Sequence, residues 1–181
     1  QLKKLVYFFC NLIYVVLLAL HNIALVGCAA APFYNLRLAN QRKKYGPKVF
    51  YELDKVVEDT IQGLEPYCWV FILTLFVTGL GFPAVHYAFH GAVKETSSVA
   101  LIGSFFKHVF VLGIVGGAFY IAFFINPKIK AIFSTFSPSE QPDEANCKIF
   151  FALRAKRMRL CKICFVFALL ILIVTPLLRF Y

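Results

Sequence analysis

Charge is the scarcest property of this sequence. Charged residues make up 15% of the 181 positions and hydrophobic residues 60%, and the mean hydropathy is +0.73. A soluble domain cannot bury that much apolar surface, so the composition excludes a soluble globular protein. It predicts a single integral membrane domain over residues 1–181, built as an all-α bundle.

Acidic residues are scarcer still. The chain has nine Asp and Glu against nineteen Lys and Arg, which gives a net charge of +10. Such a basic balance can indicate binding to nucleic acid. Here, however, the positive residues cluster in two loops between apolar stretches, which is the orientation pattern of a membrane protein. We therefore expect contact with a lipid bilayer and not with nucleic acid.

Enzyme signatures and a disulfide framework are also missing. The sequence has no Gly-rich phosphate loop, no nucleophile elbow and no pair of carboxylates within an apolar stretch. Its six cysteines are scattered over three apolar stretches and one loop, which does not fit a secreted disulfide scaffold. A catalyst that works alone is not expected.

Four apolar stretches are present, and each is long enough to cross a bilayer, which needs about 20 residues. They cover residues 5–33, 66–90, 99–125 and 160–178. The first follows two lysines and resembles a secretory signal. It is much longer than the roughly 7–15 apolar residues of such a signal, so we interpret it as a retained helix.

An amphipathic helix is predicted in the first basic loop, from about residue 48 to 64. Its apolar positions recur at helical spacing: Val49, Leu53, Val56, Val57, Ile61 and Leu64. The charged residues of this segment are expected on its other sides: Glu52, Asp54, Lys55, Glu58 and Asp59. The helix is predicted to lie on the membrane surface or against a partner subunit.

The segments that connect the four spans indicate how the chain crosses the membrane. Residues 91–98 are a short link, so spans two and three should form an antiparallel hairpin whose helices touch. Asn126-Pro127 should end the third span, and residues 126–158 should form a second basic loop with a turn-rich middle. Two spans separate the basic loops, which places both in the cytoplasm and puts the termini and residues 91–98 outside.

The four histidines lie in the first three spans. His86 and His90 are near the outer end of the second span and share a helical face. His108 lies about nine residues into the third span, roughly 13 Å deep at 1.5 Å per residue. His21 falls in the middle to outer part of the first span. All four imidazoles are therefore expected in the outer half of the bundle.

These histidines are candidate ligands of a haem. Facing helices of a bundle can each supply one imidazole to a haem iron, and four-helix membrane cytochromes follow this plan. We favour His21 with His108 as axial ligands, with His86 as the alternative partner of His108. We expect His90 to bind a propionate or a partner. Lys107 would meet a haem propionate; the alternative is that it snorkels to the interface.

A copper or zinc site is the competing cofactor interpretation. His86 and His90, with His108 or His21, could bind such an ion directly. Cys161 and Cys164 lie at the other end of the bundle, where they could form a thiolate site with Cys147, although plain packing is the commoner role of buried cysteines.

Two short segments resemble the CopD-like membrane proteins. The first is Leu20-His21-Asn22-Ile23-Ala24-Leu25-Val26-Gly27, and the second is Leu75-Phe76-Val77-Thr78-Gly79-Leu80-Gly81. The resemblance covers roughly residues 12–125. It implies a helical bundle in the bacterial cytoplasmic membrane, associated with copper handling or b-type haem. Met158 is the only methionine, so the methionine ligands expected of a copper transporter are missing.

The sequence thus predicts a b-type cytochrome subunit of a larger redox complex in the bacterial inner membrane. Other membrane or periplasmic subunits would carry out the chemistry, and this chain would carry electrons for the oxidoreductase. Two alternatives stay open: a cofactor-free structural subunit of a membrane complex, and a protein of copper transport or resistance.

Overall fold

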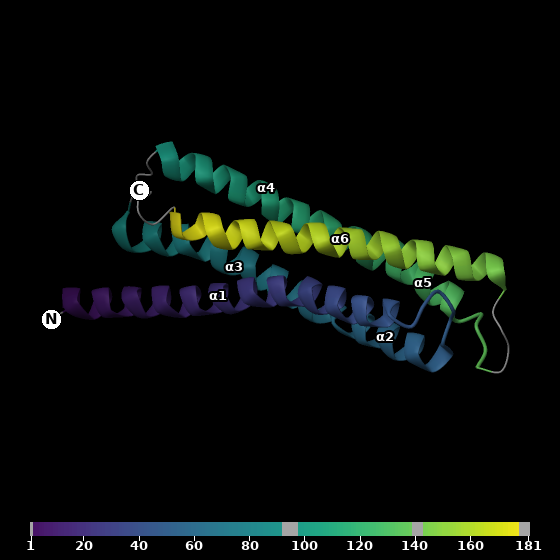
Figure 1. Cartoon of the computed structure of the whole chain (residues 1–181). Helices are drawn as coiled ribbons and strands as arrows, with labels where there is room; N and C mark the ends of the chain where they lie inside the picture. Colours follow the sequence, from purple (N-terminus) through teal and green to yellow (C-terminus); the bar gives the residue numbers. More distant parts are fainter. Residues whose placement is uncertain (1, 92–97, 139–142, 178–181) are drawn as a thin grey trace.

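A computed structural model describes residues 2–91, 98–138 and 143–177, and the regular structure in these ranges is helical. Four helices are long and apolar enough to cross a membrane, as predicted. They run side by side in one elongated bundle (Figure 1). Their bounds are α1 (Leu2–Lys43), α3 (Glu65–His90), α4 (Ser98–Tyr120) and α6 (Glu144–Leu177).

The long helices pack in the order α3, α1, α6, α4. Spans two and three meet where the ring centroids of Trp69 and Phe123 lie 6.2 Å apart, but α3 and α4 are not among the closely packed pairs, so the predicted contact along the whole hairpin is not found in the described residues. Two glycines of α4 explain why this helix packs closely against α6. A Cβ added at Gly113 would lie 2.5 Å from the Phe167 ring, and one at Gly117 would lie 2.7 Å from the Cys164 sulfur. The missing side chains let the two helices approach closely.

Two helices extend beyond the predicted spans. The third span does not end at Asn126-Pro127: a π-helical turn, η1 (Ile121–Ile125), leads directly into α5 (Asn126–Phe133). Pro127 lies in the first turn of α5, directly after the π-helical turn. The predicted second loop is also partly helical, since α6 begins at Glu144.

The short helix α2 (Tyr51–Gly63) is present, but the face that it buries differs from the predicted one. Its buried residues are Asp54, Val57, Glu58 and Ile61, whereas the side chain of Val56 is 61% exposed. These four positions follow the i, i+3, i+4, i+7 spacing of one helix face. Placing Asp54 and Glu58 on the outer sides was wrong, because arginines of α1 and α6 provide buried partners for both carboxylates.

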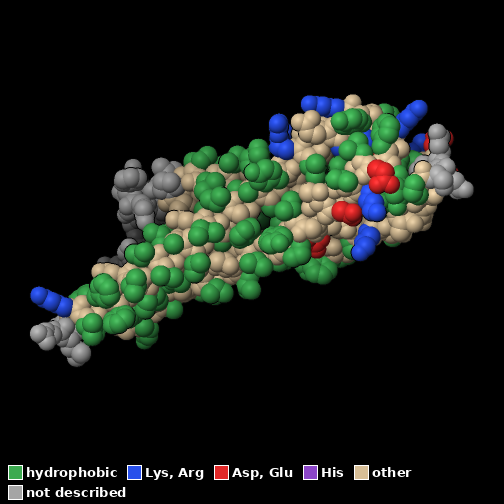
Figure 2. All heavy atoms as spheres, turned by 90° about the horizontal axis from the view of Figure 1, so that it is seen from below, with side chains coloured by type: hydrophobic (Ala, Val, Ile, Leu, Met, Phe, Trp, Pro, Cys, Tyr) green, Lys and Arg blue, Asp and Glu red, His purple; other side chains and the backbone are tan. Residues whose placement is uncertain are grey.

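The bundle has two chemically different ends. At the end with α2 and α5, an aromatic and aliphatic core forms around Ile125, Ile129, Phe136 and Phe150. Lys and Arg side chains gather at this end (Figure 2), which we call the basic end. Along most of the rest of the bundle, the coloured side chains in this view are apolar. Large apolar side chains such as Leu73 and Leu101 are 65% exposed. Such a surface is suited to contact with a lipid bilayer.

Candidate functional site

The histidines occupy three separate places. His21 of α1 faces α3, His86 and His90 share the last turns of α3, and His108 is exposed on α4. Within the described ranges, no group of three or more His, Cys, Asp or Glu residues could hold a metal ion. The structure therefore does not gather the four imidazoles into one cluster.

His21 is oriented by a hydrogen bond between helices. Its Nδ1 lies 2.8 Å from the Thr78 hydroxyl oxygen of α3. That hydroxyl donates its only proton to the Thr74 carbonyl, at 2.6 Å, so it must accept from His21. The His21 Nδ1 is thus the protonated nitrogen, and Nε2 keeps its lone pair. The Phe82 ring packs edge-on against the imidazole at 5.7 Å between centroids.

His108 is held in the same tautomer by its own helix. Its Nδ1 lies 2.6 Å from the Ser104 carbonyl, which can only accept, so Nδ1 carries the proton and Nε2 is available. In contrast to His21, its side chain is exposed on the surface of α4. The two residues agree in tautomer and differ in burial.

Lys107 lies on a more enclosed side of α4 than its neighbour His108. Its side chain is half-buried and close enough to His21 for the two groups to interact electrostatically. Among the described residues, no carboxylate comes within ion-pair distance of its ammonium group. An intramembrane cation in this position calls for an anionic partner.

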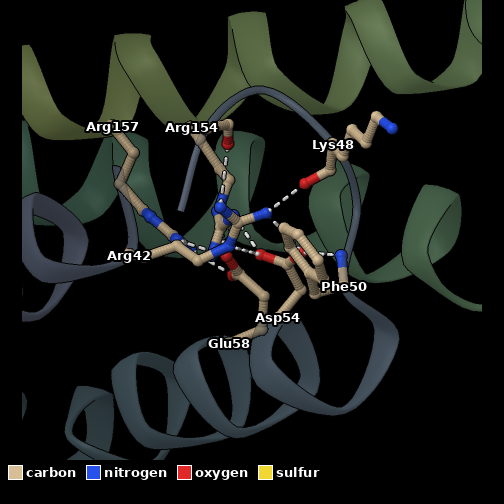
Figure 3. A network of polar contacts seen from close by, with 8 residues as sticks. Arg42, Lys48, Phe50, Asp54, Glu58, Arg154 and Arg157 are labelled. Atoms are coloured by element: carbon tan, nitrogen blue, oxygen red, sulfur yellow. Dashed lines mark hydrogen bonds and ion pairs between the residues drawn. The ribbon is translucent and has the colours of Figure 1, made fainter. Parts of the chain in front are cut away.

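The most extensive polar feature is an ionic network at the basic end, formed by Arg42 of α1, Asp54 and Glu58 of α2, and Arg154 and Arg157 of α6 (Figure 3). All five residues are buried. Arg157 binds Glu58 through two nitrogens, at 2.7 and 2.8 Å. Arg154 bridges the acids, donating to Asp54 at 2.5 Å and to Glu58 at 2.8 Å. The network fastens α2 to two membrane-spanning helices.

The arginines also set the charge state of Asp54. Burial alone would raise the pKa of this carboxyl, but the hydrogen bond from Arg42 and the charge of Arg154 outweigh burial. The net effect is a pKa below the usual value for aspartate. Asp54 is therefore held ionised beside its arginine partners.

Sequence reasoning missed this network, although a signal was present. Asp54 and Glu58 are four residues apart and lie on the same helix face as Val57. Arg154 and Arg157 are three residues apart, which also places them on one face of α6. Two carboxylates and two guanidinium groups with such spacing can meet across a helix pair.

A polar chain continues from the network to a central cavity of about 80 Å³. Arg157 donates to the Asn126 amide oxygen at 3.1 Å, and the Asn126 amide nitrogen donates to Glu65 at 2.9 Å. The cavity is large enough to hold ordered water. Asn35 lines the cavity, and its buried amide oxygen has no hydrogen-bond partner among the described residues, so a water could satisfy it.

Four cysteines line this cavity: Cys28, Cys68, Cys161 and Cys164. They come from α1, α3 and α6, and all are free thiols. Among the described residues, Cys161 and Cys164 do not form a metal-binding group with Cys147. Cys147 instead packs against the aromatic core near α5. Placing the two α6 thiols beside Cys28 and Cys68 required the order of helix packing, which the sequence alone did not provide.

No family model, curated protein or solved structure matches this chain.

Proposed function

We propose that this chain is an electron-carrying subunit of a membrane redox complex, with His21 as an axial ligand of haem b. The observation that supports this proposal most is the bond from His21 to Thr78, which leaves Nε2 free while fixing the ring. Ligating histidines characteristically donate their other ring N–H to an acceptor, which fixes the tautomer and orientation. His21 meets that requirement with a neighbouring helix as the acceptor.

The residues around His21 fit such a group. Phe82 supplies an apolar ring beside the imidazole, and Lys107 supplies a cation without a carboxylate partner in the described part of the chain. A haem propionate would be a suitable anion for Lys107. Haem, when bound, supplies one-electron transfer; Thr78 keeps the ligand oriented and Lys107 offsets negative charge.

The second axial ligand is assigned from the tautomer of its imidazole and not from its burial. His108 has the required tautomer, and its exposed side chain is the observation that counts against it. His86, which is half-buried, is the alternative partner of His108. The proposal places the chain in the bacterial inner membrane, with both termini outside and other subunits acting as electron donor and acceptor. The resemblance to CopD-like proteins agrees with this placement.

An optical spectrum tests the proposal. The full chain, purified in detergent after expression with added haem precursor, should show a reduced-minus-oxidised b-type difference band. His21→Ala should abolish the band, and the exposed His90→Ala is the matched control that should retain it. Thr78→Val should keep the band but shift the midpoint potential, because His21 loses its acceptor. A chain that purifies folded and without haem would refute the assignment.

A cofactor-free structural subunit is the second candidate function. Two observations favour it: the outward-facing His108, and the buried network that gives α2 a fixed position at the basic end. Under this hypothesis the folded chain carries no haem, and Asp54→Asn impairs assembly of the complex. Copper transport has less support, since Met158 alone cannot supply a thioether pathway.

A further inference from the structure

A pair of histidines ends α3 at the side of the bundle opposite the basic end. His86 and His90 are four residues apart, and their rings are stacked, with centroids 4.4 Å apart and planes 15° from parallel. An ion bonded to two imidazole nitrogens at about 2.0–2.1 Å keeps those nitrogens within about 4.2 Å of each other. Nearly parallel rings direct their nitrogen lone pairs side by side, so binding one ion requires the two side chains to rotate until both nitrogens point at it.

The tautomer of His90 is already the one that binds a metal. Its Nδ1 lies 3.1 Å from the His86 carbonyl, which can only accept, so Nδ1 carries the proton. The lone pair is therefore on Nε2. A backbone carbonyl that receives the other N–H is the usual support of a metal-bound histidine.

The C-terminal end of α3 provides an electric field that favours a bound cation. α3 ends at His90, and Gly91 closes it in a left-handed conformation with its N–H bonded to the Tyr87 carbonyl. The C-terminal end of a helix carries partial negative charge, which stabilises a cation. His90 is exposed and His86 is half-buried, so an ion can reach the pair from outside the bundle.

We propose that His86 and His90 bind a divalent late transition-metal ion, with water completing its coordination. This is a two-residue site, smaller than the three-residue groups that are absent from the described ranges. With His21 and His108 as the haem ligands it is a separate site, because Thr78, the partner of His21, lies eight residues before His86, about 12 Å along the helix. Imidazole ligands favour copper(II) over nickel(II) and zinc(II).

Titration with Cu²⁺ followed by electron paramagnetic resonance tests the site on the full chain in detergent. The expected result is one bound ion per chain with hyperfine coupling to imidazole nitrogen. His86→Ala and His90→Ala should each weaken binding at least about tenfold, since even outer-shell partners of a metal are worth 10- to 100-fold. His108→Ala, an exposed histidine on another helix, is the matched control and should leave the affinity unchanged.

Equal Cu²⁺ affinity in the wild type, His86→Ala and His90→Ala would overturn the proposal, and so would a spectrum dominated by sulfur ligands. His90→Ala decides the test if His86→Ala does not fold, because an exposed side chain contributes little to packing. His21→Ala should keep the copper signal. Loss of haem and loss of the metal site can therefore be distinguished.

Discussion

Arg42 binds Asp54 through two hydrogen bonds, from Nε at 2.6 Å and from Nη2 at 2.8 Å. The same guanidinium also donates to the carbonyls of Gly46 and Lys48, at 3.1 and 2.6 Å, so it closes the loop between α1 and α2. A bidentate pair with both partners buried is specific in geometry as well as strong. This contact fixes where α2 begins.

Removing the charge of Asp54 should destabilise the chain strongly. Asp54→Asn leaves Arg42 and Arg154 without their shared anion, and breaking a buried pair in this way costs about 3–5 kcal/mol. Thermal unfolding in detergent, followed by circular dichroism, measures the loss. Asp59→Asn is the matched control, since Asp59 is exposed on the same helix. Equal melting temperatures for the two variants would show that the network contributes little.

The network also predicts a dependence of stability on pH. The pKa of folded Asp54 is lowered, so the unfolded chain binds the proton more tightly, and stability rises with pH across the interval between the two pKa values. The contribution of Asp54 is fully present above the unfolded pKa of about 3.9, and it is lost as the pH falls from there through the folded pKa. Unfolding measured from pH 7 to pH 2 should show this loss. The Asp54→Asn variant should have a flatter profile over the same range.

Neighbouring valines of α2 should respond very differently to the same substitution. Val57 is 2% exposed and Val56 is 61% exposed. Val57→Asp places an unpaired carboxylate in the packed face and should release α2, whereas Val56→Asp should be nearly neutral. Limited proteolysis between α1 and α3 reports the release. Similar cleavage rates for the two variants would mean that α2 is not docked on the bundle.

Thiol labelling should establish which side of the membrane holds the basic end. A membrane-impermeant reagent added to intact cells should reach a cysteine introduced in place of Thr96, but not Cys147. The expectation comes from the excess of Lys and Arg at the end that holds Cys147. The reverse pattern would invert the topology and move His86 and His90 to the cytoplasmic side.

Hydropathy predicted the four spans because lipid contact requires long apolar helices, whatever their neighbours are. The buried face of α2 was missed because charged residues were assigned to the outside by default. Glu58 is buried against Arg154 and Arg157, about 100 residues later, and Asp54 is shared between Arg154 and the nearer Arg42. The spacing of residues within one segment does not indicate a partner so far away in the sequence.

The histidines show a similar limit. Sequence gives the depth of a residue along its helix, but the rotation of the helix depends on packing. Lys107 and His108 are adjacent and therefore point about 100° apart on α4, and only packing against α6 decides which of them is enclosed. The cysteine-lined cavity could not be predicted for a similar reason. Its four thiols come from three helices, and the sequence does not indicate which helices pack together.

The ionic network has a consequence for the order of events during synthesis. The arginines of α6 are made 96–100 residues after the carboxylates that they bind. At about 5–20 residues per second, that interval lasts roughly 5–20 s. During this interval, Arg42 is the only arginine of the network that has been made. Glu58 has none of its final partners. Docking of α2 is therefore a late step, completed when the last membrane helix arrives.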